Sequence, residues 1–256
     1  MIDTHCHLDA AEFDHDRDAV LASAIGTGVR GIVLPSVERA NFGAVASICR
    51  MHAECHAAYG IHPLYVDRAQ EQDLDALRLM LANEPAVAVG EIGLDRFVEP
   101  HNDARQLHFF VEQLRIAREF DLPVVLHVRR AVDAVLKELR RLRLRGGIAH
   151  AFNGSRQQAN EFVKLGFKLG FGGAMTFPRA LRIRELAATL PLSAIVLETD
   201  APDISPNWQH EQRNSPDQLP RIARTLAELR SISLDELIFA TNQNALQVLP
   251  ALSALH

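Results

Sequence analysis

The sequence predicts an α/β fold, a closed (β/α)8 barrel of the TIM type with its functional site at the carboxyl-terminal mouth. Eight short apolar runs, rich in β-branched residues, alternate with longer amphipathic stretches along the 256 residues. Continuous apolar strands that alternate with helices are typical of a parallel sheet covered on both faces. Eight such units in about 250 residues fit a closed barrel. An open, doubly wound sheet is the alternative arrangement.

The predicted strands are spaced along most of the chain and cover residues 1–7, 31–37, 57–63, 86–94, 122–128, 147–152, 168–173 and 194–200. Between them, apolar residues recur at helical spacing. We expect helices at 14–28, 41–56, 72–83, 103–120, 131–144, 155–165 and 179–190, followed by two more at 216–230 and 233–248. The one long irregular stretch, 201–215, has the length of a functional or disordered loop. No linker divides the chain, so we expect residues 1–256 to form a single domain.

The composition limits the class of protein. Hydrophobic residues make up 48% of the chain, enough for a sizeable core, and the formal net charge is −5. A protein that binds a polyanion through its overall field would be basic, so any contact with nucleic acid must be local. Three cysteines without a CxxC motif indicate free thiols in a reducing compartment. Because the sequence has no basic leader and no apolar run of about 18 residues, we expect a cytoplasmic protein that does not contact a membrane.

Two histidines separated by one residue lie near the start of the chain, in the stretch MIDTHCHLDA. A strand alternates its faces with a period of two, so His5 and His7 should point the same way and Cys6 the other way. Two neutral imidazoles side by side make a poor core but a good half of a metal site. The rest of the chain must supply the other half.

Other predicted strands also end in residues that bind metals. In a parallel barrel, the carboxyl ends of all strands meet at one mouth, where barrel enzymes keep their chemistry. Four imidazoles and two carboxylates would gather there with one further histidine beside them, namely His5, His7, His127, His150, Glu91, Asp200 and His62. We therefore expect a site for two divalent cations.

The ligand types limit the metal and indicate a reaction. Mixed imidazole and carboxylate ligands without thiolate suit zinc, manganese, cobalt or iron, and open positions would permit magnesium. A carboxylate such as Glu91 can bridge two ions, with one oxygen to each. Two ions about 3.5–4 Å apart can activate a water and stabilise both oxygens of a displacement. Asp200, the only carboxylate at a late strand end, can bind one ion and take a proton from that water.

Seven short motifs, spread over nearly the whole chain, resemble those of the TatD family of metal-dependent deoxyribonucleases, which are amidohydrolase-type barrels. They are DTHCHLD at 3–9, GIHP at 60–63, GEIGLD at 90–95, LHVRRA at 126–131, HAFNGS at 150–155, ETDAP at 198–202 and RNSP at 213–216. The resemblance implies two ions bridged by Glu91, one held by His5, His7 and Asp200 and the other by His127 and His150.

The resemblance also implies roles for residues around the ions. His62 would lie near the site, where it could touch a phosphate, and Arg129 would be a basic residue at the mouth. The chain departs from the family pattern at Arg96, which intervenes where an aromatic residue often follows Asp95, and at Ala151, where cysteine is common. Because Arg96 and Arg129 follow mouth strands directly, both are candidate phosphate ligands through the fork geometry of the guanidinium group.

Together these features predict a metal-dependent hydrolase, a deoxyribonuclease or phosphodiesterase that acts on DNA ends through a water activated by two cations (Zn, Mn or Mg). Asp200 and Glu91 are the predicted catalytic residues, and His62, Arg129 and Arg96 are the predicted substrate-binding residues. The alternative is hydrolysis of a small ester, lactone or amide, for which we would expect a more apolar mouth with fewer arginines. A structural metal protein fits poorly, because structural zinc sites are closed and rich in thiolates. Nothing in the sequence indicates an obligate protein partner.

Three further features have simpler interpretations. His52 and His56 are one turn apart in the predicted helix 41–56, and we expect them on its surface rather than on a metal. Asp95 either caps the turn after the fourth strand or takes part in catalysis. The basic run at 137–145 lies on a predicted outer helix and is expected to be a solvated face.

Overall fold

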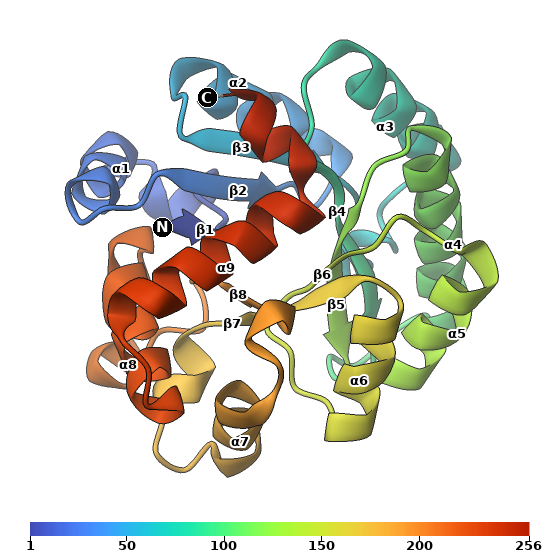
Figure 1. The fold of residues 1–256 in the computed structure, drawn as a ribbon. Helices are drawn as coiled ribbons and strands as arrows, with labels where there is room; N and C mark the ends of the chain where they lie inside the picture. Colours follow the sequence, from blue (N-terminus) through green and yellow to red (C-terminus); the bar gives the residue numbers. More distant parts are fainter. Residues whose placement is uncertain (256) are drawn as a thin grey trace.

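Eight parallel strands form one sheet in sequence order, which confirms the predicted barrel (Figure 1). The computed structural model of the protein describes residues 1–255. Backbone hydrogen bonds from Thr4 N to Leu197 O (3.0 Å) and from Asp200 N to His5 O (2.8 Å) join the first and last strands, so that the barrel is nearly closed. The strands are β1 (Ile2–Asp3), β2 (Gly31–Pro35), β3 (Cys55–Tyr59), β4 (Ala88–Asp95), β5 (Val124–Arg129), β6 (Gly147–Ala149), β7 (Phe167–Phe171) and β8 (Ile195–Leu197).

Each strand is followed by the α-helix of the same number, and a further helix, α9, ends the fold. No α-helix in the described part of the chain is long and apolar enough to span a membrane. The helices are α1 (Arg17–Gly26), α2 (Phe42–Met51), α3 (Glu71–Asn83), α4 (Asp103–Glu119), α5 (Val132–Leu142), α6 (Arg156–Lys164), α7 (Leu181–Thr189), α8 (Leu219–Arg230) and α9 (Leu234–Val248).

The barrel interior is a small apolar core that α9 closes at one end. Ala245 and Val248 of α9, with Leu249 directly after it, pack against side chains from the lumen. Those lumen side chains are fully buried and come from β2–β6 and β8, namely Val33, Ala58, Ala88, Val125, Ile148 and Val196. Figure 1 shows α9, in red, running across the barrel.

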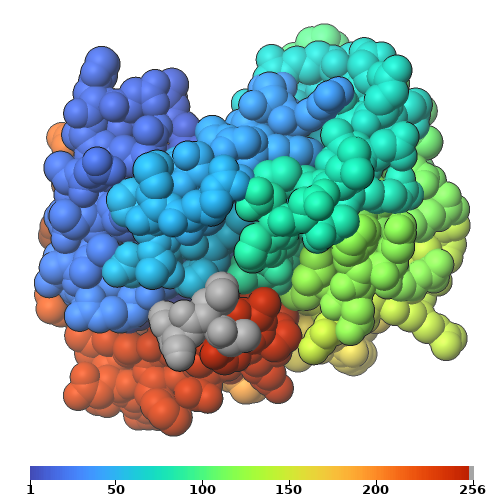
Figure 2. All heavy atoms as spheres, turned by 90° about the horizontal axis from the view of Figure 1, so that it is seen from above, coloured from blue at the N-terminus to red at the C-terminus, as the bar shows by residue number. Residues whose placement is uncertain are grey.

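Two asparagines fix α9 to the amino-terminal end of the barrel. Asn244 Nδ2 donates to the carbonyl oxygen of Ile195 (2.7 Å), the first residue of β8. Asn242 Oδ1 accepts from Ile2 N (3.0 Å), the first residue of β1. The carboxyl-terminal mouth is therefore at the opposite end, and in Figure 2 the surface is hollowed on the side away from the red C-terminal segment.

The close approach of β4 and β5 depends on Gly93. Gly93 pairs with His127 across the ladder, and a Cβ at Gly93 would lie 1.9 Å from the His127 carbonyl oxygen. Its φ of +155° is also one that residues with a side chain rarely adopt. The ladder shifts register between Val89 and Ile92, the segment that carries Glu91. Glycine therefore allows the strand that carries Glu91 to lie directly against the strand that carries His127.

Two predicted boundaries are wrong in ways that move histidines. The first strand ends at Asp3 rather than at residue 7, so His5 and His7 lie in the loop after it. α2 ends at Met51, and residues Cys55–Tyr59 form β3. His56 pairs with Val33 in the ladder and is 3% exposed, so it is not on the surface of an outer helix. Strand pairing with β2 overrides the helical spacing at His56.

The long stretch 201–215 after β8 is held by two side chains. Asn214 is fully buried and donates from Nδ2 to the carbonyl oxygens of Thr199 (2.8 Å) and Asp203 (2.9 Å). Arg213 forms an ion pair with Asp16 (2.6 Å), which immediately precedes α1. The loop is therefore bound both to the end of β8 and to the N-terminal segment.

Candidate metal centre

Glu91 is a buried carboxylate surrounded by imidazoles. It lies in β4, is 1% exposed, and has five histidines of the described chain within 3.4 Å of its oxygens. Oε2 lies 3.1 Å from His5 Nε2 and 3.3 Å from His7 Nε2. Oε1 lies 2.9 Å from His127 Nδ1 and 2.9 Å from His150 Nε2. The two oxygens of one carboxylate thus face two different pairs of histidines.

Asp200 lies on the side of the Glu91 Oε2 atom. Its Oδ1 is 3.4 Å from His5 Nε2 and 3.9 Å from His7 Nε2. The ligand atoms of His5, His7 and Asp200 lie within 4.8 Å of one another, and His5, Glu91 and His150 form a second set of the same kind. The structure therefore brings together all six residues that the sequence singled out as metal ligands.

Two of the histidines have their free nitrogen set by neighbouring groups. His7 Nδ1 lies 3.1 Å from the carbonyl oxygen of Pro35, which can only accept, so Nδ1 donates and Nε2 keeps its lone pair. His127 Nε2 lies 2.9 Å from Asp95 Oδ2 and donates to it, which leaves the Nδ1 lone pair towards Glu91. Such partners commonly fix the orientation of metal-binding histidines.

His62 differs from the other imidazoles because its tautomer makes it a donor. Leu64 N donates to His62 Nδ1 (3.1 Å), so the ring proton must be on Nε2, which lies 3.4 Å from Glu91 Oε1. Burial lowers the pKa of His62 to about 4, and the ring is therefore neutral. Although His62, Glu91 and His127 form a third compact set of ligand-type atoms, His62 directs an N–H into the centre rather than a lone pair.

Several residues at the mouth have a left-handed backbone. Arg130 (φ 54°), Ala151 (φ 43°) and Asp200 (φ 60°) follow β5, β6 and β8 by one to three residues. Such conformations cost about 1–3 kcal/mol each and are found most often at functional sites. Asp3 helps to hold the last of them, since its carboxylate accepts from Thr199 N (2.9 Å) and Thr199 Oγ1 (2.6 Å) directly before Asp200.

The donor set fits divalent cations. In the part of the chain that the structure describes, no lysine or arginine lies within ion-pairing distance of Glu91 or Asp200, so imidazoles are their only cationic partners. His5 Nε2 and His7 Nε2 are only 3.2 Å apart, an arrangement that a proton or a metal ion must stabilise. No cysteine belongs to the three sets, which excludes the thiolate-rich chemistry of structural zinc.

Burial and charge shift the pKa values in the centre. The pKa of Glu91 lies well below its usual range because the attraction of His150 and its neighbours outweighs burial, which raises it. Burial lowers the pKa of His7 and His150, but the interaction with Glu91 is stronger and raises them to about 9 and about 10. Burial raises the pKa of Asp200. Cations must therefore compete with protons for these imidazoles.

Glu198 is a site residue that the sequence reasoning missed. It is 1% exposed, its Oε1 accepts from Ala151 N (2.5 Å) and lies 3.9 Å from His150 Nδ1. Burial raises its pKa to about 8. A Cβ at Gly170 would lie 2.0 Å from Glu198 Oε2, so glycine in β7 makes room for this carboxylate. The signal in the sequence was an acid inside the apolar run AIVLETD, two residues before Asp200.

The two predicted substrate-binding arginines lie at the rim rather than in the centre. The Arg129 guanidinium lies 3.7 Å from the centroid of the Phe97 ring. Arg96 Nε pairs with Asp103 Oδ1 (3.0 Å), which compensates part of its charge. Neither side chain belongs to the compact sets of ligand-type atoms.

The barrel, the cluster at its carboxyl-terminal mouth and its relatives define a class of protein, the metal-dependent hydrolases. A family model described as TatD related DNase matches residues 2–250. The chain belongs to this family, as its motifs indicate.

Similar proteins agree with this assignment. The uncharacterized metal-dependent hydrolase YjjV of Escherichia coli K12 is 43% identical over 247 residues, which is 95% of each chain. The crystal structure of YjjV, described as a TatD homolog, matches with a TM-score of 0.95 at 41% identity and covers 98% of both chains. A Cronobacter sakazakii protein named 3'-5' ssDNA/RNA exonuclease TatD is 32% identical over 256 residues, 96% of each chain.

Proposed function

We propose that the protein is a phosphodiesterase that uses two divalent cations, zinc, manganese or magnesium, to remove nucleotides from DNA ends. The observation that carries the proposal is the position of Glu91, whose two oxygens face separate histidine pairs. The family description TatD related DNase and the exonuclease name of the Cronobacter relative support a nucleic-acid substrate.

The proposed roles follow from the geometry. His5, His7 and Asp200 hold one cation, His127 and His150 hold the other, and Glu91 bridges them. When bound, two cations supply Lewis-acid stabilisation of phosphoryl oxygens and lower the pKa of a water. This arrangement fits a displacement at phosphorus, in which both the attacking and the leaving oxygen need stabilisation.

Asp200 and His62 are the proposed groups that handle protons and orient the substrate. Asp200 is 8% exposed, and its raised pKa makes it a better base for the attacking water than an ordinary aspartate. His62 presents a fixed Nε2–H to the centre and can donate to a non-bridging oxygen of the scissile phosphate. Arg129 and Arg96, at the rim, contact the phosphates of the strand outside the centre.

The arginines favour a phosphodiester over the alternative substrates, a small ester, lactone or amide. The rim beside β5 carries Arg129 and Arg130 on either side of a strand end, and both guanidiniums lie against Phe97. A binding site for an uncharged ester would not require these cations. The same cluster of ligands would serve either reaction, so the difference lies in the rim.

The test is a panel of substrates with protein that has been stripped by a chelator and reloaded with zinc, manganese or magnesium. A DNA oligonucleotide and bis(p-nitrophenyl) phosphate should be hydrolysed, and a simple ester should be a poor substrate. Length analysis of end-labelled DNA should give products that shorten from one end. Rapid ester hydrolysis without phosphodiester cleavage by any reloaded sample would contradict the proposal.

A further inference from the structure

A second pocket lies at the rim of the barrel, beside the metal-ligand cluster. It has a volume of about 610 Å³ and is formed by the segments after β4, β5 and β6 and by the start of α7. We call it the arginine pocket, and its principal side chains are Phe97, Arg129, Arg130, Asn153 and Arg182. Arg129 lies two residues beyond His127 on β5, a rise of roughly 6.6 Å along a strand. The pocket therefore begins one strand repeat away from a proposed cation ligand.

Three cations in this pocket have no acidic partner. In the described residues, no carboxylate lies within ion-pairing distance of Arg129, Arg130 or Arg182. Arg182 donates instead to the side-chain oxygen of Asn153 (2.7 Å). The one acid that lines the pocket, Asp133, accepts from Gln158 Nε2 (3.0 Å). The pocket thus concentrates positive charge in a protein whose net charge is −5.

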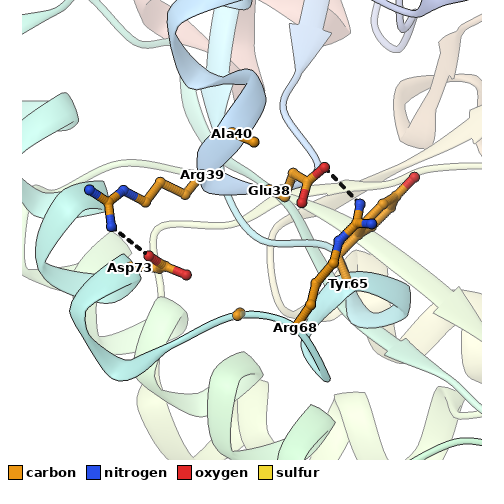
Figure 3. Close-up of a pocket in the computed structure, with 7 residues that line it drawn as sticks. Glu38, Arg39, Ala40, Tyr65, Arg68 and Asp73 are labelled. Carbon is orange, nitrogen blue, oxygen red and sulfur yellow. Dashed lines mark hydrogen bonds and ion pairs between the residues drawn. The ribbon is translucent and has the colours of Figure 1, made fainter.

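Another pocket, between the segments that follow β2 and β3, provides a contrast. There Arg39 pairs with Asp73 (3.0 Å) and Arg68 pairs with Glu38 (2.7 Å), as Figure 3 shows. Both arginines of that pocket are neutralised inside the protein, so it has no excess charge to offer an anion. The unpaired state of the three arginines is therefore specific to the arginine pocket and not a general property of surface arginines in this chain.

The arginines are also held in position. The guanidiniums of Arg129 and Arg130 lie 3.7 Å and 4.4 Å from the Phe97 ring centroid. Asp95 Oδ1 accepts from Phe97 N (2.7 Å) and Val98 N (3.0 Å), while its other oxygen contacts the His127 ring. One carboxylate thus links the floor of the arginine pocket to the metal-ligand cluster, so the two sites keep a fixed relative position.

We propose that the arginine pocket binds a second phosphate group of the same strand, one that neighbours the phosphate at the cation centre. Guanidinium groups suit phosphate because their fork matches two of its oxygens. This inference rests on the proposed function and names its substrate more closely. The enzyme requires at least two phosphates in series, which makes a nucleic-acid strand a better substrate than an isolated phosphodiester.

The first experiment measures binding to the metal-loaded, full-length protein. The probe is a fluorescent single-stranded dT hexamer with phosphorothioate linkages, which keep the charges and slow cleavage, and the readout is anisotropy over a range of salt concentrations. The test variant combines Arg130→Asn with Arg182→Gln, because asparagine tolerates the left-handed backbone at residue 130. Its slope of log affinity against log salt should be shallower by about 1.4, or about 0.7 for each lost phosphate contact.

The control variant has matched changes at the other end of the barrel. Arg143 also has a left-handed backbone (φ 50°), ends α5 and has no carboxylate within ion-pairing distance in the described chain, and Arg118 is an exposed arginine of α4. Arg143→Asn combined with Arg118→Gln removes the same charge and should keep the wild-type slope. Equal slopes in the wild type and the test variant would overturn the proposal, as would an equal loss in both variants.

The second experiment compares the dinucleotide dTpdT, with one phosphate, and the trinucleotide dTpdTpdT, with two. Wild-type kcat/KM should rise at least about tenfold from the first to the second, the scale of a charged hydrogen bond, and the test variant should lose this rise. A wild type that cleaves both equally well would overturn the pocket's role and leave the proposed function intact. A wild type that cleaves neither would contradict the proposed function, while the salt slopes would still decide whether the pocket binds phosphate.

Discussion

Asp95 determines which nitrogen of His127 faces the metal-ligand cluster. Its Oδ2 lies 2.9 Å from His127 Nε2, so that Nδ1 lies 2.9 Å from Glu91 Oε1. The sequence left two roles open for Asp95, a turn cap or a part in catalysis. The structure gives it the capping contacts, to Phe97 N and Val98 N, together with the contact to His127. Asp95 is therefore a positioning residue that links a rim loop to a candidate ligand.

Asp95→Asn should weaken metal binding while the protein stays folded. The asparagine oxygen is needed by the two backbone N–H groups, so its amide N–H₂ would face His127 Nε2 and favour the wrong tautomer. The expected loss of metal affinity is about 10–100-fold, the usual effect of removing such a partner. Metal titration and the melting temperature would be measured on the same samples. Asp103→Asn, which changes an acid at the rim, is the control, and equal affinities for the two variants would refute the prediction.

Glu91→Gln should reduce the binding of both cations. A neutral amide cannot balance two positive centres, and it replaces a carboxylate whose two oxygens face separate histidine pairs. We expect fewer than two ions per chain at concentrations that saturate the wild type. Elemental analysis after dialysis gives the stoichiometry. A wild type that never binds more than one ion would count against the bridging role before any variant is tested.

Asp200→Asn should separate metal binding from turnover. Asp200 contacts the His5 and His7 side of the centre but not His127, so the cation on the His127 side should remain. Turnover should fall by about 10²-fold or more, the scale of lost acid–base help. Bound metal, melting temperature and phosphodiesterase rate belong on one preparation. A folded, metal-loaded and fully active variant would exclude Asp200 as the proton acceptor.

Metal loading near neutral pH should release protons. In the metal-free protein the pKa of His7 is about 9 and that of His150 about 10, both above the unperturbed histidine value of about 6.5, so both rings are protonated at pH 7. Because a raised pKa favours the protonated ring, metal affinity should increase with pH until these pKa values are passed. Calorimetric titration in buffers of different ionisation enthalpy counts the protons. Loading without proton release at pH 7 would contradict this ordering.

Gly170→Ala should destabilise the protein through Glu198. The new Cβ would lie 2.0 Å from Glu198 Oε2 and 2.8 Å from Oε1, and the Ala151 N–H holds that carboxylate in place. Overpacking of this kind typically costs about 1–3 kcal/mol of unfolding free energy. Combining Gly170→Ala with Glu198→Ala should recover much of that loss, which denaturant titration of the four proteins in the cycle would measure. Additive losses would place the effect of Gly170 elsewhere.

The sequence predicted the barrel and the gathering of strand-end histidines because both follow from periodicity along single segments. A parallel barrel brings the strand ends to one mouth, so His127 and His150 could be placed beside His5 without knowledge of any contact. The role of Asp95 could not be predicted, because it depends on the cross-strand position of His127. Burial of Glu198 depends on the missing side chain of Gly170, on a different strand. The ligand roles themselves remain predictions that metal analysis must test.

The packing of α9 against the lumen has a consequence for traffic through the protein. Ala245, Val248 and Leu249 fill the far end of the barrel, so the metal-ligand cluster is reached through one doorway only. A strand cannot be threaded through such a blind chamber. Its end must enter and each released nucleotide must leave by the same route before the strand can advance. Cations and chelators share that route, so a strand seated across the arginine pocket should slow the removal of metal.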